Sequence, residues 1–144
     1  MLLRCVLRTV LWILFVILLS VVVIMANPGP ISGKVPYKMT VKATAYTIHD
    51  PGMNGRGLTS RGGYARPWYT VAVDPRVIPL GSRLYIPALA ATPSGGWFVA
   101  DDTGGAIKGK RIDICVHTRS WALNFGRRNL TVYVYPPGNQ ADRR

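Results

Sequence analysis

Residues 102–113 read Asp-Thr-Gly-Gly-Ala-Ile-Lys-Gly-Lys-Arg-Ile-Asp, so three glycines lie between two aspartates. From Arg111 to Val116 apolar and polar residues alternate, which predicts a β-strand with the isoleucines on its core face. Asp113 then projects from the opposite face, together with Cys115 and His117. Such a glycine-rich connection between strand-end carboxylates indicates a site more than a simple linker. The same spacing also fits a surface aspartate paired with one of the many arginines.

Similar patterns on both sides of this stretch predict a mainly β domain. Five further strands are expected, at residues 37–47, 69–73, 83–86, 97–100 and 130–135. One short helix is expected at 120–125, with Ser120 as its N-cap and Gly126 just past its end. Residues 48–68 are rich in glycine and predict a long irregular loop that borders a binding site. Many short strands without a repeat favour a closed barrel over a sandwich.

The N-terminal residues predict export. Arg4 and Arg8 precede an uncharged apolar run at residues 9–26, which lacks an A-x-A cleavage pattern at its end. We expect residues 1–26 to be an N-terminal transmembrane or signal segment, and an uncleaved anchor is favoured over a cleaved signal peptide. The chain then divides into a linker at 27–36, a domain at 37–136 and a basic tail at 137–144. The domain is expected outside the cytoplasm, anchored to the inner membrane.

The charge and the cysteine and histidine content indicate which partners, disulfides and metal sites to expect. The net charge of +12 suggests an anionic partner, although colloidal solubility explains it equally well. Export argues against nucleic acid and for anionic lipid headgroups or cell wall. Cys5 and Cys115 would lie on different sides of the membrane segment, so no disulfide is expected. His49 and His117 are the only histidines and no ligand cluster accompanies them, so we expect no metal and no cofactor.

All six acidic residues are aspartates, so any carboxyl chemistry must come from them. Asp142 lies in the tail and Asp50 in the glycine-rich loop, whereas Asp74, Asp102 and Asp113 lie at or within predicted strands. Partial burial of Asp113 would raise its pKa toward that of a general acid.

Five sequence blocks, in order, resemble the 3D domain family, which is named for three aspartates and includes the membrane-bound lytic transglycosylase A group. The blocks are Ala-Thr-Ala-Tyr-Thr (43–47), Val-Ala-Val-Asp-Pro (71–75), Ile-Pro-Leu-Gly-Ser (78–82), Asp-Thr-Gly-Gly-Ala-Ile-Lys-Gly (102–109) and Arg-Ile-Asp (111–113). The resemblance implies a double-psi β-barrel. It also implies cleavage of the bond between N-acetylmuramic acid and N-acetylglucosamine in peptidoglycan, with formation of a 1,6-anhydro ring. Residues 58–62, Leu-Thr-Ser-Arg-Gly, depart from the Thr-x-Thr-Gly element common in the family.

The resemblance also implies a site, formed by the residues of this sequence that match the family's functional positions. Asp74, Asp102 and Asp113 match the three aspartates, and Asp113 matches the acid/base. The other two would raise the pKa of Asp113 by like charge or position substrate hydroxyls. The substrate-binding candidates are Thr44, Tyr46, Thr103, Gly104, Gly105, Lys108 and Arg111, with the last two facing muramyl peptide carboxylates.

Two other functions remain open at this point. A peptidoglycan hydrolase would use two carboxyl groups instead of one. A non-catalytic module would bind wall glycan without cutting it. The oligomeric state is not indicated.

The remaining reactive and aromatic residues have plainer interpretations. Cys115 and His117 are two residues apart on one strand face, about 7 Å, so a packed thiol is favoured over a thiol–imidazole pair. Trp68, Trp97 and Trp121 are candidates for a sugar-stacking cleft, although barrel core is the default for each.

Overall fold

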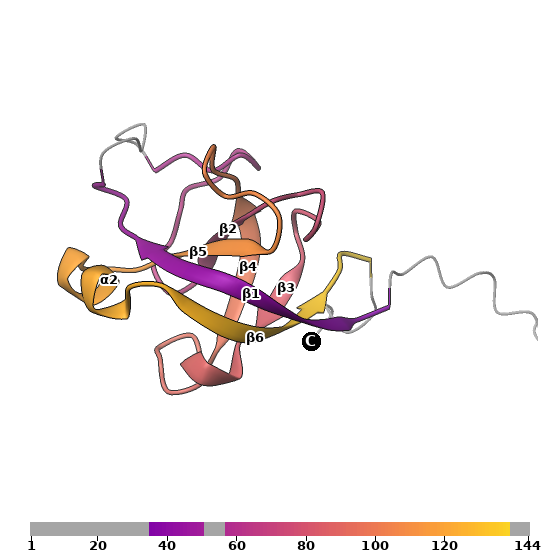
Figure 1. Ribbon diagram of the computed structural model, residues 1–144. Coiled ribbons are helices and arrows are strands. Elements are labelled where there is room, and N and C mark those ends of the chain that lie inside the picture. The colour runs from indigo at the N-terminus through magenta and orange to yellow at the C-terminus, as the bar shows by residue number, and fades with distance from the viewer. Residues whose placement is uncertain (1–34, 51–56, 139–144) are drawn as a thin grey trace, which may run out of the picture. The chain divides into compact units, whose positions relative to one another are not determined.

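The computed structural model of the protein describes residues 35–50 and 57–138. Along the chain the elements are β1 (Tyr37–Tyr46), β2 (Thr70–Val73), β3 (Arg83–Tyr85), the 3-10 helix η1 (Pro87–Leu89), β4 (Trp97–Asp102), β5 (Arg111–Cys115), α2 (Arg119–Phe125) and β6 (Arg128–Tyr135) (Figure 1). All six predicted strands and the predicted helix are present, with boundaries within two residues of those expected.

The strands form a closed barrel in the order β1-β5-β2-β4-β3-β6. The β1–β5 and β2–β4 pairs are parallel and the remaining four pairs are antiparallel. Closure leaves no unpaired edge among the six described strands, which confirms the predicted barrel. The finer assignment to the double-psi class stays a prediction.

Inward-facing aliphatic side chains fill the barrel. On β5, Ile112 and Ile114 are fully buried, and Val116 follows them into the core as the alternation predicts. Each such side chain contributes about 1.5–3 kcal/mol through burial. Asp113 therefore lies on the outer face of a strand that the core holds in place.

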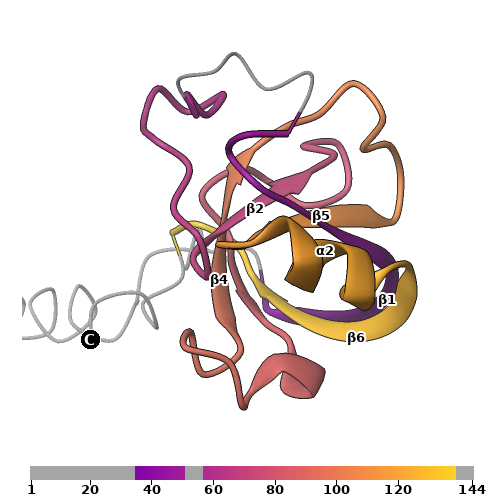
Figure 2. The ribbon, with the colours of Figure 1, turned by 90° about the vertical axis from the view of Figure 1, so that its left-hand side faces the viewer.

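Helix α2 covers one end of the barrel, beside β1 and β6 (Figure 2). The predicted N-cap was wrong: Thr118, not Ser120, caps the helix, because its Oγ1 accepts from the Trp121 N–H at 3.3 Å. The helix ends at Gly126 as expected, where φ is +61°. Trp121 stacks on Phe125 at 5.0 Å, so it belongs to the edge of the core.

The predicted anchor at 1–26, most of the linker and most of the tail lie outside the described residues. Within the part of the chain that the structure does describe, no helix has the length and apolar character needed to span a bilayer.

Candidate active site

Two of the three family aspartates lie in one row across adjacent strands. Thr44 of β1 is paired with Asp113 of β5, Asp113 with Ala72 of β2, and Ala72 with Asp102 of β4. A register shift between Val71 and Ala72 sets the last pairing, so Asp102, and not its neighbour in sequence, lies opposite Ala72. Residues paired side by side share a sheet face, so both carboxyl groups lie on the outer surface with a small alanine between them.

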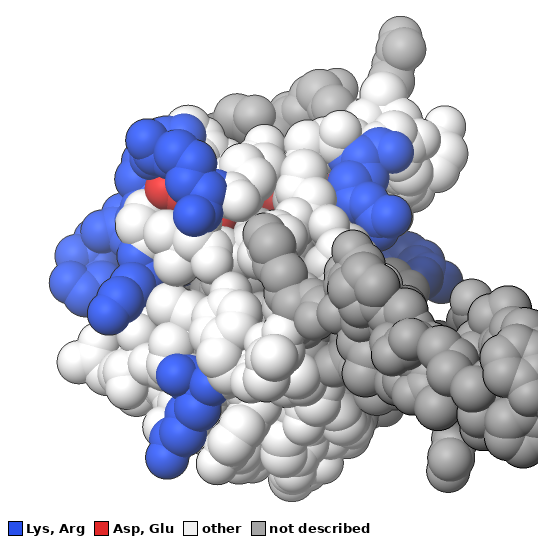
Figure 3. All heavy atoms as spheres, turned by 90° about the vertical axis from the view of Figure 1, so that its right-hand side faces the viewer, with Lys and Arg blue, Asp and Glu red and all other residues white. Residues whose placement is uncertain are grey.

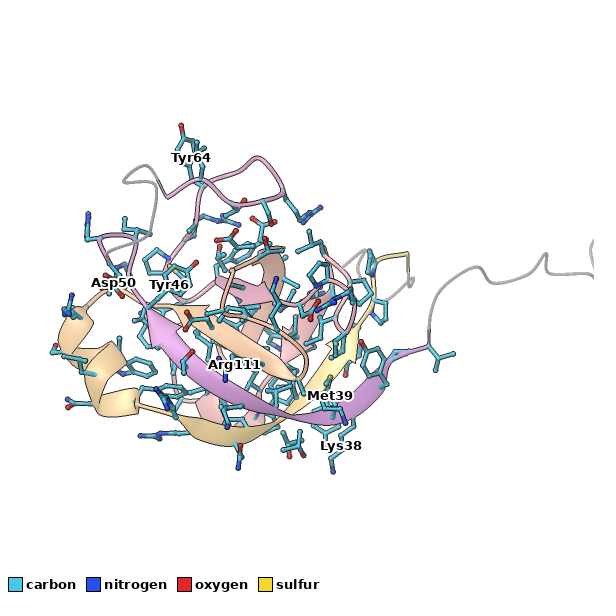
Figure 4. The ribbon with its side chains drawn as sticks, turned by 45° about the horizontal axis from the view of Figure 1, so that its top comes forward. Lys38, Met39, Tyr46, Asp50, Tyr64 and Arg111 are labelled. Carbon is cyan, nitrogen blue, oxygen red and sulfur yellow. The ribbon has the colours of Figure 1, made fainter. Side chains whose placement is uncertain are left out.

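A pocket of about 480 Å³ lies over this row. Two loops border it: the start of the segment after β1, which contributes Asp50, and the loop after β4, which contributes Thr103 to Ile107. The sequence predicted such a role for the first of these loops, at residues 48–68. Its lining residues are Thr44, Ala45, Tyr46, Asp50, Ala72, Asp102, Thr103, Gly104, Gly105, Ala106, Ile107 and Asp113. Tyr46 and Asp50 lie together at the C-terminal end of β1, far from Lys38 and Met39 at its start (Figure 4).

Asp113 has the environment of a general acid. Its side chain is half-buried, and Thr44 Oγ1 donates a 2.7 Å hydrogen bond to its Oδ1. Burial raises the pKa of Asp113 above its ordinary value and the charge of Asp50 raises it further, while Thr44 and Arg111 act in the opposite direction. The like charge behind the raised pKa thus comes from Asp50, whereas the sequence had suggested Asp74 or Asp102.

Asp102 is held by backbone amides. It is 8% exposed, and its Oδ1 accepts from the Ser60 N–H at 2.9 Å and the Thr103 N–H at 2.8 Å. Ser60 belongs to the block that departs from the family pattern, so this block still supports the site through its backbone. Asp101, one residue earlier, instead pairs with Arg61 at 2.9 Å.

Asp74 does not line the described pocket. It is 2% exposed, and its carboxylate accepts from the backbone and guanidinium of Arg76 and from the Gly109 N–H at 2.7 Å. The Arg76 side chain, and then Gly109, hold the pKa of Asp74 well below its usual range. Asp74 therefore ties the end of β2 to the loop that carries the pocket's Thr103 and Gly104.

The substrate-binding candidates divide into two groups. Thr44, Tyr46, Thr103, Gly104 and Gly105 line the pocket, whereas Lys108 and Arg111 do not. Lys108 is exposed. Arg111 Nη1 instead donates a 3.0 Å hydrogen bond to the Ala106 carbonyl, which closes the loop on itself.

Sequence reasoning missed several lining residues, of which Asp50 and Ala72 matter most. Asp50 accepts from the Thr47 N–H at 2.9 Å and from its hydroxyl at 3.0 Å, which fixes a carboxylate at the pocket wall. The only signal for Asp50 was its place in the glycine-rich loop. Ala72 had none beyond its position inside a family block.

The loop is closely fitted around Gly104. A Cβ built there would lie 2.8 Å from Ile107 Cγ1, whereas one built at Gly105 would meet nothing within 4 Å. Ile107 is itself buried, so it has little room to move. The first glycine is therefore needed for close packing and the second is not.

Cys115 is a packed thiol in the interior of the protein. It is fully buried with Tyr46 and Ala65, and burial raises the pKa of its thiol to about 11. His117 is exposed. The packed-thiol interpretation is therefore confirmed. Although the alternation put Cys115 on the outer face, a loop residue covers that face here.

Among residues 35–50 and 57–138, no three His, Cys, Asp or Glu side chains are grouped so as to hold a metal ion.

Comparison with known proteins identifies the family to which the domain is similar. Residues 69–136 match the 3D domain family. The chain is 43% identical over 98 residues to the cell wall-binding protein YocH of Bacillus subtilis. The aligned region covers 67% of this chain and 32% of the relative. It is 36% identical over 104 residues to the putative cell wall shaping protein YabE of the same organism, in an aligned region that covers 72% of this chain and 23% of that relative. The chain thus spans about a third or less of the length of these relatives.

Among solved structures, MltA from E. coli is similar at 24% identity and a TM-score of 0.41, over 55% of this chain and 27% of that one. The family match begins just before β2 and ends just after β6, so it includes all three family aspartates. The chain therefore contains a domain of the 3D family.

Proposed function

We propose that this protein acts on the glycan of the bacterial cell wall as a lytic transglycosylase, with Asp113 as its single acid/base. Membership of the 3D family and the names of the wall-binding and wall-shaping relatives support the cell-wall assignment. The observation that carries the catalytic part is Asp113 itself: a half-buried carboxyl group with a raised pKa, on the wall of a pocket of about 480 Å³.

In the proposed reaction Asp113 acts twice. As a neutral acid it protonates the glycosidic oxygen between N-acetylmuramic acid and N-acetylglucosamine, so that this bond breaks. As a carboxylate it then accepts the proton of the muramyl C6 hydroxyl, whose oxygen bonds to C1 and closes the 1,6-anhydro ring. The Thr44 hydrogen bond to Oδ1 fixes the orientation of the carboxyl group, so that Oδ2 is the oxygen that exchanges the proton.

The other pocket residues would position the sugar. Within the described residues both hydrogen bonds to Asp102 end on Oδ1, so its Oδ2 can accept from a substrate hydroxyl. Gly104 and Gly105 let the glycan approach the loop backbone. Asp74 acts as a positioning residue, because it contacts the loop and not the pocket. Lys108, exposed beside the loop, remains a candidate contact for stem-peptide carboxylates.

One observation favours a second candidate function, that of an inverting hydrolase. The Cα atoms of Asp113 and Asp102 are two strand spacings apart, roughly 10 Å. Both carboxyl groups line the same pocket, so a second one is available to activate water, as an inverting hydrolase requires with its carboxyl groups about 6.5–9.5 Å apart.

The test incubates purified full-length protein with peptidoglycan sacculi in water labelled with ¹⁸O and analyses the products by mass spectrometry. We expect unlabelled products that end in anhydromuramic acid, lighter by one water than hydrolysed fragments. Asp113→Asn should lower the rate by a factor of about 10²–10⁴ or more, because the amide has no acidic proton to give. Asp101→Asn is the matched control, since Asp101 is the neighbour of Asp102 that lies outside the pocket lining.

Other products would contradict the proposal. Incorporation of ¹⁸O would identify a hydrolase. Binding to sacculi without any soluble product would identify a glycan-binding module. Full activity in Asp113→Asn would remove Asp113 from the mechanism.

These proposals imply a location outside the cytoplasm and peptidoglycan as the partner, with no role for nucleic acid. We further propose that residues 1–26 anchor the protein in the inner membrane. Fractionation of cells that produce the full chain tests the anchor, because a cleaved segment would release a shorter protein.

A further inference from the structure

A second and larger pocket lies elsewhere on the barrel surface. Its volume is about 660 Å³, and among its lining residues are Arg61, Trp68, Tyr69, Arg83, Trp97 and Val99. We call it the arginine–aromatic pocket. None of its described lining residues lines the aspartate pocket. The two pockets are therefore distinct sites, although both lie along β4, where Trp97 and Val99 come before Asp102.

The register of the sheet explains how these residues meet. Arg83 of β3 is paired with Val99 of β4 on one side and with Tyr135 of β6 on the other. Trp97 is paired with Tyr85, in the next outward-facing row. The outer surface of β4, β3 and β6 is consequently aromatic around a central arginine.

Two aromatic side chains in the pocket are accessible, and one of them, Trp97, is held in place by its neighbours. Tyr69 is 39% exposed and Trp97 is 37% exposed. The Trp97 ring contacts the rings of Tyr85 at 5.0 Å and Tyr135 at 5.4 Å, and the Arg83 guanidinium lies 4.7 Å from it. A ring that is already fixed loses little conformational entropy when a ligand packs against it.

The charge of the pocket suits an anion. Its described lining includes two arginines and no carboxylate. Arg61 pairs with Asp101 through Nη1 at 2.9 Å, beside the pocket. Guanidinium groups bind carboxylates through two parallel hydrogen bonds, and aromatic faces next to them favour a ligand that also has an apolar surface. On the face of the molecule that Figure 3 shows, Lys and Arg atoms lie at several separate places and few acidic atoms are visible.

Backbone strain gives an independent observation. Trp68 lines this pocket with φ at +60°, the only described residue other than glycine with a positive φ. Its N–H donates a 2.9 Å hydrogen bond to the Cys115 carbonyl, and its ring meets Trp121 edge-on at 4.7 Å. A bulky residue in this conformation is unfavourable unless its surroundings enforce it, and such residues concentrate at ligand sites.

We propose that the arginine–aromatic pocket binds a sugar that carries a carboxylate, at a site separate from the aspartate pocket. The sugar ring would pack against Trp97 or Tyr69 while its carboxylate pairs with the Arg61 guanidinium. The choice of muramic acid as the probe rests on the proposed function. Binding here requires no cleavage, so the site would hold glycan whether or not Asp113 cuts it.

The test uses the full chain, labelled with ¹⁵N and purified in detergent micelles, and follows the tryptophan indole signals by NMR. The probe is the disaccharide of N-acetylglucosamine and N-acetylmuramic acid, and the neutral control is N,N′-diacetylchitobiose. We expect the acidic disaccharide to shift the Trp97 and Trp68 signals saturably and the neutral one to bind about tenfold more weakly. The Asp113→Asn variant should give the same shifts, which separates this result from any failure of catalysis.

Substitution of the ring provides the second arm. Trp97→Leu should weaken binding of the acidic disaccharide about five- to tenfold, as expected for loss of one aromatic contact. Tyr64→Leu is the matched control, because Tyr64 is exposed and lies outside this pocket (Figure 4). Unchanged affinity in Trp97→Leu would overturn the proposal, provided that the other backbone signals keep their positions. Shifts confined to Thr44, Gly104 and Gly105, or equal binding of the neutral disaccharide, would also overturn it.

Discussion

The hydrogen bond between Thr44 and Asp113 predicts how the site depends on pH. The Thr44 hydroxyl donates to Oδ1 at 2.7 Å and so stabilises the carboxylate form. It lowers a pKa that burial and Asp50 raise. The substitution Thr44→Val keeps the size of the side chain and removes the donor. The pKa of Asp113 should therefore rise.

The size of the effect follows from the burial of the pair. A hydrogen bond to a charged group is worth about 1.5–3 kcal/mol, and one pKa unit corresponds to about 1.4 kcal/mol. Because both side chains are only half-buried, we take the lower end, about 1.5 kcal/mol in favour of the carboxylate form. Without this hydrogen bond a protonated Asp113 would persist to higher pH, so the alkaline limb of the pH–rate profile should move to higher pH.

Carboxyl ¹³C NMR titration measures the pKa of Asp113 directly, even in a protein that cuts slowly. Thr40→Val is the matched control, because Thr40 lies on the same strand and is exposed. An unchanged or lower pKa in Thr44→Val, with the control also unchanged, would show that Thr44 does not set the protonation of Asp113.

Two further predictions concern the loop after β4. Asp74→Asn should lower the melting temperature at pH 7 and should have a smaller effect near pH 3. The reason is that the pKa of Asp74 is depressed in the folded protein. The stabilisation by its charge is therefore fully present above the pKa of the unfolded state and is lost as the pH falls toward the pKa of the folded state. Equal losses at both pH values in thermal unfolding would exclude a charge effect. Gly104→Ala should reduce cleavage of sacculi, because the added methyl group collides with Ile107, whereas Gly105→Ala should be tolerated. If the two alanine variants have the same activity, the fit at Gly104 is unimportant.

The sequence by itself determined the local structure. Alternation along 111–116 correctly identified the strand, its core face and the outward direction of Asp113, because side-chain direction in a strand depends only on position. Gly126 correctly marked the end of the helix, because glycine adopts a positive φ without a steric penalty. The glycine-rich composition of 48–68 indicated the loop that borders the pocket.

The tertiary structure decided which residues meet. A register shift brings Asp102 into the row with Asp113, and such a shift depends on pairing between strands that are distant in sequence. Asp50 approaches Asp113 only because the barrel closes β1 against β5. Asp74 has the same strand-end signature as Asp102, yet Arg76 and Gly109 occupy its carboxylate. Periodicity fixes the face on which a side chain lies, but the partners on that face come from other parts of the chain, and only packing in three dimensions selects them.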